Sequence, residues 1–64
     1  MRVILPDRSV HSMDTEACTI GELLSRFRIN PLEVVVSVNG RIAPEDTIAG
    51  GDDRVRIIRI AHGG

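Results

Sequence analysis

Val34-Val35-Val36-Ser37-Val38-Asn39-Gly40 forms the clearest strand signal in the sequence. Its β-branched residues favour extended backbone. The Asn-Gly pair that follows them is preferred in a type I′ hairpin turn, because both turn positions require positive φ. The stretch therefore predicts a strand that turns back through a tight hairpin into a short return strand at Arg41-Ile42-Ala43.

A helix is predicted shortly before this strand. Thr19-Ile20-Gly21-Glu22 has the spacing of a capping box, in which the threonine and glutamate side chains each bond a backbone N–H at the helix start. Apolar residues then recur at i, i+3, i+4 and i+7 on one face: Ile20, Leu23, Leu24 and Phe27. Asn30 precedes Pro31, which disfavours helical backbone. We therefore expect the helix to end before Asn30 and Pro31-Leu32-Glu33 to form one short turn.

The N-terminal residues predict a β-hairpin. Arg2-Val3-Ile4-Leu5 is a β-branched run, Pro6-Asp7-Arg8 is a turn signal, and Ser9 to Met13 is a second, weaker strand. A polar connection from Asp14 to Cys18 would then lead to the helix.

The C-terminal third predicts two breaks and a last strand. Pro44-Glu45-Asp46-Thr47 and Gly50-Gly51-Asp52-Asp53 have turn composition, and Arg54 to Ile60 is extended. One helix packed across one face of a mixed sheet of about five strands is an α+β arrangement that suits a short chain. We interpret it as a β-grasp, ubiquitin-like fold with its first and last strands paired at the sheet centre. Residues 1–60 would form the domain, and residues 61–64 a flexible C-terminal Gly-Gly tail.

Composition narrows the class of function. The chain has 64 residues, nine acidic and eight basic, and a single aromatic residue of the Phe, Tyr and Trp group, Phe27. It therefore lacks both the basic excess and the stacking platforms of nucleic-acid binders. No apolar run approaches the ~18 residues of a membrane span. A single cysteine, Cys18, cannot form an internal disulfide and is expected to be a packing residue. We expect a cytoplasmic protein that binds neither nucleic acid nor membrane.

Few residues suggest chemistry in the side chains. His11 and His62 have no acidic or thiol partners at metal-ligand spacing, so no metal site is predicted. Asp52-Asp53 follows two glycines and is expected to be a turn. All eight basic residues are arginine, so the chain has no lysine to accept an isopeptide bond.

The last strand does not divide cleanly into two faces. Val55 and Ile57 fit an inward face, but the same alternation directs Ile58 and Ile60 outward with the arginines. Ile4 of the first strand would join them, which gives an apolar patch beside the tail that could dock a partner. The alternative is a β-bulge that returns Ile58 and Ile60 to the core.

The sequence ends in Gly63-Gly64. Glycine has no Cβ, so a terminal glycine carboxylate can enter a narrow channel and be approached from either face. An enzyme that adenylates a C-terminus requires such access. A frayed end is the other explanation of such a pair.

Together these segments resemble the ThiS/MoaD family of ubiquitin-like sulfur carriers, and most closely its ThiS branch, which serves thiamine biosynthesis. The resemblance rests on the order and spacing of five segments: Thr19 to Leu24, Glu33 to Gly40, Ile42 to Thr47, Gly51 to Ile58, and Gly63-Gly64. The similarity covers nearly the whole chain from Thr19 onward, together with the opening strand.

The resemblance implies a carrier, not an enzyme. A partner adenylating enzyme of the ubiquitin-activating (ThiF/MoeB) type would use ATP and magnesium to adenylate Gly64, while Gly63 allows the tail to thread into its site. A cysteine desulfurase or rhodanese-like donor would then supply the sulfur of a Gly64 thiocarboxylate. The carrier itself would bind no cofactor or metal, and Ile4, Ile58 and Ile60 would contact the partner.

The acceptor of the sulfur is open at this stage. Thiazole synthase, which forms the thiazole ring of thiamine, is the first expectation. A molybdopterin synthase small subunit is the first alternative. A ubiquitin-like protein modifier, a carrier for transfer RNA thiolation, and an interaction domain without C-terminal chemistry are the others.

Overall fold

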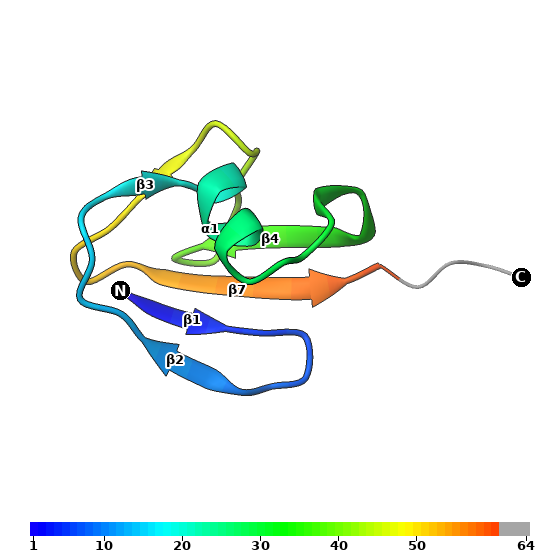
Figure 1. Cartoon of the computed structure of the whole chain (residues 1–64), viewed down its shortest axis with the longest axis horizontal. Helices are drawn as coiled ribbons and strands as arrows, with labels where there is room; N and C mark the ends of the chain where they lie inside the picture. The colour runs from blue at the N-terminus through cyan, green and yellow to red at the C-terminus, as the bar shows by residue number, and fades with distance from the viewer. Residues whose placement is uncertain (61–64) are drawn as a thin grey trace, which may run out of the picture.

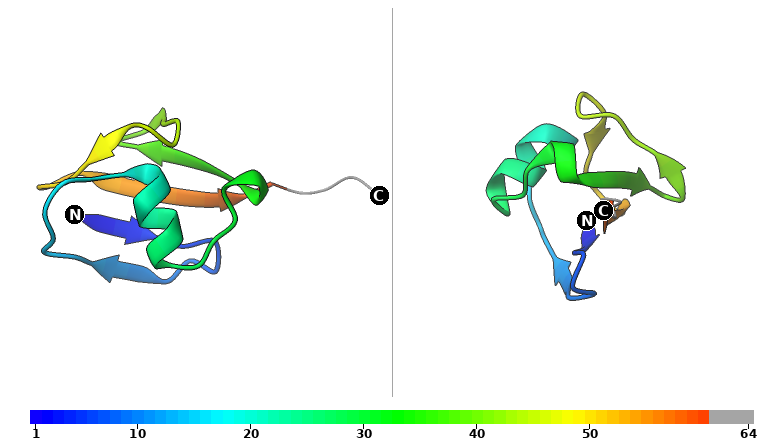
Figure 2. Two further views of the ribbon diagram at one scale, coloured as in Figure 1. Left: turned by 45° about the horizontal axis from the view of Figure 1, so that its top comes forward. Right: turned by 90° about the vertical axis from the view of Figure 1, so that its right-hand side faces the viewer.

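The computed structural model describes residues 1–60 and has the predicted β-grasp architecture (Figure 1). The main sheet has five strands in the spatial order β2-β1-β7-β4-β5. In chain order they are β1 (Arg2–Ile4), β2 (Val10–Ser12), β4 (Val34–Val38), β5 (Arg41–Ile42) and β7 (Arg54–Arg59). Helix α1 (Ile20–Arg26) lies across one face of this sheet (Figure 2), and the short 3₁₀ helix η1 (Pro31–Glu33) follows it.

The first and last strands lie side by side, as predicted. β1 and β7 are parallel, with Val3 opposite Val55, and β7 pairs on its other side with antiparallel β4. β7 is therefore hydrogen-bonded on both edges. This position in the middle of the sheet ties the C-terminal strand more firmly than an edge position would.

The core lies between α1 and the sheet. Its side chains come from the inward face of the helix and from alternate strand positions. The buried apolar residues are Val3, Ile20, Leu23, Leu24, Val34, Val36, Ala43, Ala49, Val55 and Ile57. The predicted apolar face of the helix is thus confirmed, with Phe27 partly buried against the core.

The ends of α1 follow two known backbone patterns. Thr19 Oγ1 accepts from the Glu22 N–H and Glu22 Oε2 accepts from the Thr19 N–H, which confirms the capping box. At the other end, the Arg28 N–H bonds the Ser25 carbonyl and the Ile29 N–H bonds the Leu24 carbonyl. This pair of bonds is a Schellman motif, whose left-handed position is usually glycine. Arg28 occupies it here with φ of 58°.

A second small sheet was not predicted. β3 (Cys18–Thr19) pairs with β6 (Ile48–Ala49), so the expectation of a polar connection through Cys18 is wrong at its last residue. Two-residue strands carry no readable alternation, because their pairing depends on a contact distant in sequence. Gly50 permits that contact: a Cβ at this position would lie 2.8 Å from the Ala17 Cα.

The predicted hairpin turn is confirmed, with φ of 52° at Asn39 and 84° at Gly40. Asn39 also links this turn to the one before β7. Its Nδ2 donates to Asp53 Oδ1 at 2.9 Å, and its Oδ1 accepts from the Arg54 N–H at 2.9 Å. Asp53 Oδ2 accepts from the Gly50 N–H, and these bonds hold the pKa of Asp53 below its ordinary value.

Within residues 1–60, no helix is long and apolar enough to cross a membrane.

Candidate functional site

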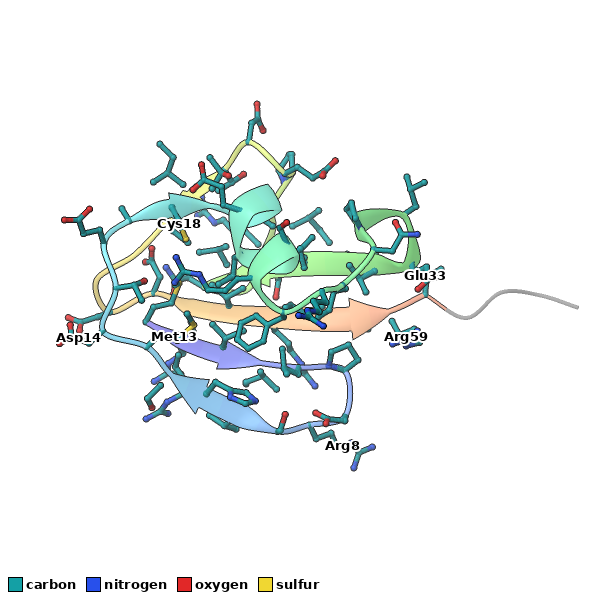
Figure 3. All side chains as sticks on the ribbon, in the orientation of Figure 1. Arg8, Met13, Asp14, Cys18, Glu33 and Arg59 are labelled. Atoms are coloured by element: carbon teal, nitrogen blue, oxygen red, sulfur yellow. The ribbon has the colours of Figure 1, made fainter. Side chains whose placement is uncertain are left out.

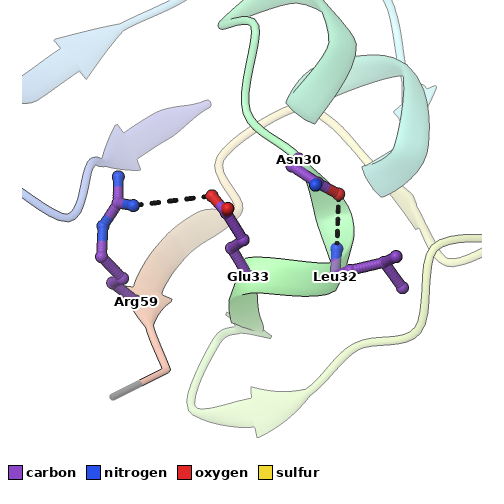
Figure 4. Close-up of polar contacts among 4 residues, drawn as sticks. All are labelled: Asn30, Leu32, Glu33 and Arg59. Carbon is purple, nitrogen blue, oxygen red and sulfur yellow. Dashed lines mark hydrogen bonds and ion pairs between the residues drawn. The ribbon is translucent and has the colours of Figure 1, made fainter. Parts of the chain in front are cut away.

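The end of β7 is fastened to η1. The Ile60 N–H donates to the Glu33 carbonyl at 2.8 Å, and Arg59 Nη1 lies 3.6 Å from Glu33 Oε2 (Figure 4). The turn that presents Glu33 is itself closed by Asn30, whose side chain accepts from the Leu32 N–H at 3.0 Å. The ion pair is exposed and contributes little by itself. The backbone bond, however, extends the support of the last strand to Ile60. The predicted site residues Gly63 and Gly64 lie outside the described residues.

The two faces of β7 alternate without interruption. Ile57 is 1% exposed, whereas Ile58 is 48% exposed and Ile60 is 40% exposed. The register between β7 and β4 runs unbroken from Val34 opposite Arg59 to Val38 opposite Val55. No β-bulge returns the two isoleucines to the core, so the bulge alternative is wrong.

Ile4 lies on the same open face of the sheet, opposite to α1. Its neighbour Val3 is fully buried, and alternation directs the half-buried Ile4 away from the core. Ile4 and Ile58 line one shallow depression together with Arg56. Ile60 lies farther along, past the end of the strand. The structure therefore brings Ile4 and Ile58 together and sets Ile60 beside them toward the C-terminus.

Two further residues belong to this surface. Val10 stands opposite Ile4, and Val35 stands opposite Ile58. We define the apolar patch as Ile4, Val10, Val35, Ile58 and Ile60. Sequence analysis omitted the two valines, although alternation along the predicted N-terminal hairpin would have placed Val10 across from Ile4.

The other side chains considered for chemistry have structural surroundings. Cys18 is half-buried and packs against the core. It lies at the far end of the molecule from Glu33 and Arg59 (Figure 3). The His11 ring packs edge-on against Phe27 at 5.3 Å. Within residues 1–60, no three His, Cys, Asp or Glu side chains are grouped so that they could hold a metal ion.

Near the first turn, Asp7 is the only other carboxyl group in the described part of the chain with a resolved shift. Two hydrogen bonds from Ser9, one from its hydroxyl and one from its N–H, lower the pKa of Asp7. These bonds close the β1–β2 turn. They create no acid or base suited to catalysis near neutral pH.

Comparisons with known proteins agree with this architecture. The crystal structure of a thiamine biosynthesis protein (ThiS) from Geobacter metallireducens matches with a TM-score of 0.71 and 23% sequence identity, over 100% of both chains. An NMR solution structure of a thiamine biosynthesis protein from Geobacter metallireducens matches with a TM-score of 0.64 and 23% identity, over 100% of this chain and 88% of that chain. At this identity the likeness shows the fold alone.

The sequence comparisons identify the family. No curated protein sequence matches the chain. A family model described as small archaeal modifier protein 2 matches residues 2–61, which is nearly the whole chain. The predicted relationship to ubiquitin-like sulfur carriers of the ThiS/MoaD type is confirmed. The chain belongs to the small archaeal modifier protein 2 family, within the ubiquitin-like sulfur carriers and modifiers.

Proposed function

We propose that the chain is a carrier whose Gly64 carboxylate is adenylated by a partner enzyme and then converted to a thiocarboxylate. The observation that carries this proposal is the placement of the last strand. β7 lies between two strands at the sheet centre, and Ile60 is bonded to η1 at the border of the apolar patch. A rigid domain with a docking face thus ends four residues before Gly64.

The chemistry needs no side chain of the carrier. A carboxylate is a poor electrophile until it bears a good leaving group. Attack of the Gly64 carboxylate on the α-phosphorus of ATP, with magnesium held by the partner, expels pyrophosphate and gives an acyl-adenylate. A persulfide from a cysteine desulfurase or rhodanese-like donor displaces AMP, and a thiol reductant cleaves the resulting acyl disulfide. The thiocarboxylate that remains is a much stronger nucleophile than the original carboxylate. This chemistry places the carrier in the cytoplasm, where ATP is available.

The apolar patch is the surface that we assign to the adenylating enzyme, which is of the ubiquitin-activating type. Ile4, Ile58 and Ile60 face the same side and adjoin the end of β7. Exposed apolar side chains grouped in this way are typical of protein-binding surfaces. Docking through them would set the tail in one direction, while Gly63 allows it to enter a narrow channel.

Two outputs of the activated glycine are supported by different observations. The shared fold with two thiamine biosynthesis structures supports sulfur delivery to a thiazole synthase. The family description as a modifier supports transfer of Gly64 to a lysine of another protein. Both outputs begin with the same adenylate, so the activation step can be tested independently of them.

The activation step is tested by intact mass. Incubation with ATP, magnesium, a sulfur donor and the adenylating enzyme of the same organism should raise the mass by about 16 Da, one oxygen exchanged for sulfur. The gain should vanish when Gly64 is deleted. Ile58→Ala should slow it, whereas Ile48→Ala is a matched control because Ile48 is 67% exposed but lies on β6 outside the patch. If the intact carrier gains no mass with an enzyme shown to be active, the proposal is wrong.

The two outputs are separated by digestion of the cell proteome with trypsin. Cleavage after Arg59 would leave the five residues Ile60 to Gly64 on any modified lysine. Target peptides that carry this remnant would establish modification. Transfer of label from the thiocarboxylate to a thiazole product, with no such peptides, would establish sulfur delivery.

A further inference from the structure

The charges of this protein are sorted by position, although their sum is only −1. Within residues 1–60, no strand of the main sheet contains Asp or Glu; all nine acidic residues lie in α1, η1 and the loops. Five of the eight arginines lie in those strands. They are Arg2, Arg41, Arg54, Arg56 and Arg59.

Three of these arginines are neighbours on the open face. Arg2 stands opposite Arg54 across the parallel pair, and the next outward position pairs Ile4 with Arg56. Like charges directly opposite each other on a sheet are unfavourable. We define the arginine cluster as Arg2, Arg54 and Arg56.

No carboxylate neutralises this cluster in the described part of the chain, where the single ion pair joins Arg59 to Glu33. Asp14 and Asp52 line a shallow depression with Arg2 and Arg54 but make no ion pair with them. The cluster is thus an arrangement that costs the free protein energy and that an external anion would relieve.

The cluster and the apolar patch divide the open face. Ile58, Val35 and Ile60 lie toward the C-terminal end of β7, whereas Arg54 lies at its start. Four residues of strand separate Arg54 from Ile58, which is about 13 Å. Between them Arg56 borders both parts: it lines one depression with Ile58 and another with Arg54 and Ser37.

We propose that the arginine cluster binds a carboxylate-rich segment of the adenylating enzyme that docks on the apolar patch. The acidic segment would lie about 13 Å beyond the apolar contact, on the side away from the tail. This inference rests on the proposed function and adds the chemistry of the partner. The pairing makes docking directional, because rotation of the carrier by 180° on the patch would place the arginines against the apolar part of the partner.

An acidic protein fits this face better than nucleic acid. The arginines adjoin isoleucine and valine, and an apolar centre with arginine is typical of protein interfaces. Single-stranded nucleic acids require aromatic platforms, and the open face has no aromatic side chain among the described residues.

The test is the salt dependence of adenylation by the enzyme of the same organism, followed by ATP–pyrophosphate exchange at varied carrier concentration. Arg54→Glu and Arg56→Glu should each raise KM about 10-fold at low salt, with kcat unchanged. The neutral variants Arg54→Gln and Arg56→Gln should give smaller increases and flatten the dependence of KM on salt. Arg26→Glu, a charge reversal on the exposed side of α1, is the control and should leave KM within about twofold of the wild-type value.

The possible failures are distinguishable. If wild-type carrier supports no exchange with an active enzyme, the proposed function fails. If wild-type exchange is normal and all four cluster variants match Arg26→Glu in KM, the inference fails alone, provided that circular dichroism shows them folded. Binding of a fluorescent oligonucleotide that the glutamate variants abolish, with an unaltered KM, would overturn the assignment in favour of nucleic acid.

Discussion

Truncation of two adjacent residues of β7, Ile57→Ala and Ile58→Ala, should separate folding from docking. The side chains are identical and neighbouring, but they face opposite sides of the sheet. Ile57 is 1% exposed and belongs to the core, whereas Ile58 is 48% exposed on the apolar patch. The pair therefore tests the register of the C-terminal strand as well as its function.

The expected magnitudes follow from burial. Removing a buried isoleucine side chain down to alanine costs about 2–5 kcal/mol, because a cavity remains in addition to the lost transfer free energy. A chain of this length has a total stability of about 3–10 kcal/mol. Ile57→Ala should therefore unfold much of the protein at 25 °C, and Ile57→Val should cost about 0.5–1.5 kcal/mol. Ile58→Ala removes three carbon atoms that are half in water already, at a cost of about 1 kcal/mol.

The assay has two parts. Urea unfolding is followed by far-ultraviolet circular dichroism, because the chain has no tryptophan or tyrosine for fluorescence. Docking is followed by the KM for carrier in ATP–pyrophosphate exchange. Ile57→Val should lower the unfolding midpoint and leave KM unchanged. Ile58→Ala should retain most of the stability and raise KM.

A reversed order of stabilities would refute the reasoning. A register slip of one residue exchanges the faces of every strand position, so Ile58→Ala would then be the more destabilising change. If Ile58→Ala and Ile48→Ala have the same KM as the wild type, the strand assignment survives and the docking role of Ile58 does not.

Three further predictions concern the scaffold. Arg28→Gly should stabilise the protein by about 0.5–1 kcal/mol, seen as a higher melting temperature, because glycine adopts φ of 58° without Cβ strain; a lower melting temperature would contradict the Schellman assignment. Gly50→Ala should lower the melting temperature, since the new Cβ would lie 2.8 Å from the Ala17 Cα, and an unchanged value would show that β3 can move aside. The lowered pKa of Asp53 means that its contribution to stability is complete above its ordinary pKa of 3.8 and is lost as the pH falls through the folded-state value; acid unfolding of Asp53→Asn should therefore be less steep, and an identical acid limb would refute this.

Local signals in the sequence determined most of the individual elements. The capping box at Thr19, the Asn39-Gly40 turn and the apolar periodicity of α1 each depend on residues within seven positions of one another. Such interactions form in the same way wherever the segment lies in a fold. The outward direction of Ile58 and Ile60 also followed from alternation alone, once a bulge was weighed against it.

Contacts distant in sequence had to come from the tertiary structure. The β3–β6 pair joins two dipeptides that lie 30 residues apart, and no pattern within either one announces the pairing. The bond between Asn39 and Asp53 joins two turns, and the left-handed Arg28 contradicts the usual preference for glycine.

The site shows the same division. The sequence by itself supplied the terminal Gly63-Gly64, the outward isoleucines and the absence of lysine. Only the tertiary structure placed Val10 beside Ile4 and Arg2 beside Arg54, and bonded Ile60 to Glu33. The physical reason is that strand periodicity sets which way a side chain faces, whereas the order of the strands in the sheet sets which side chains become neighbours.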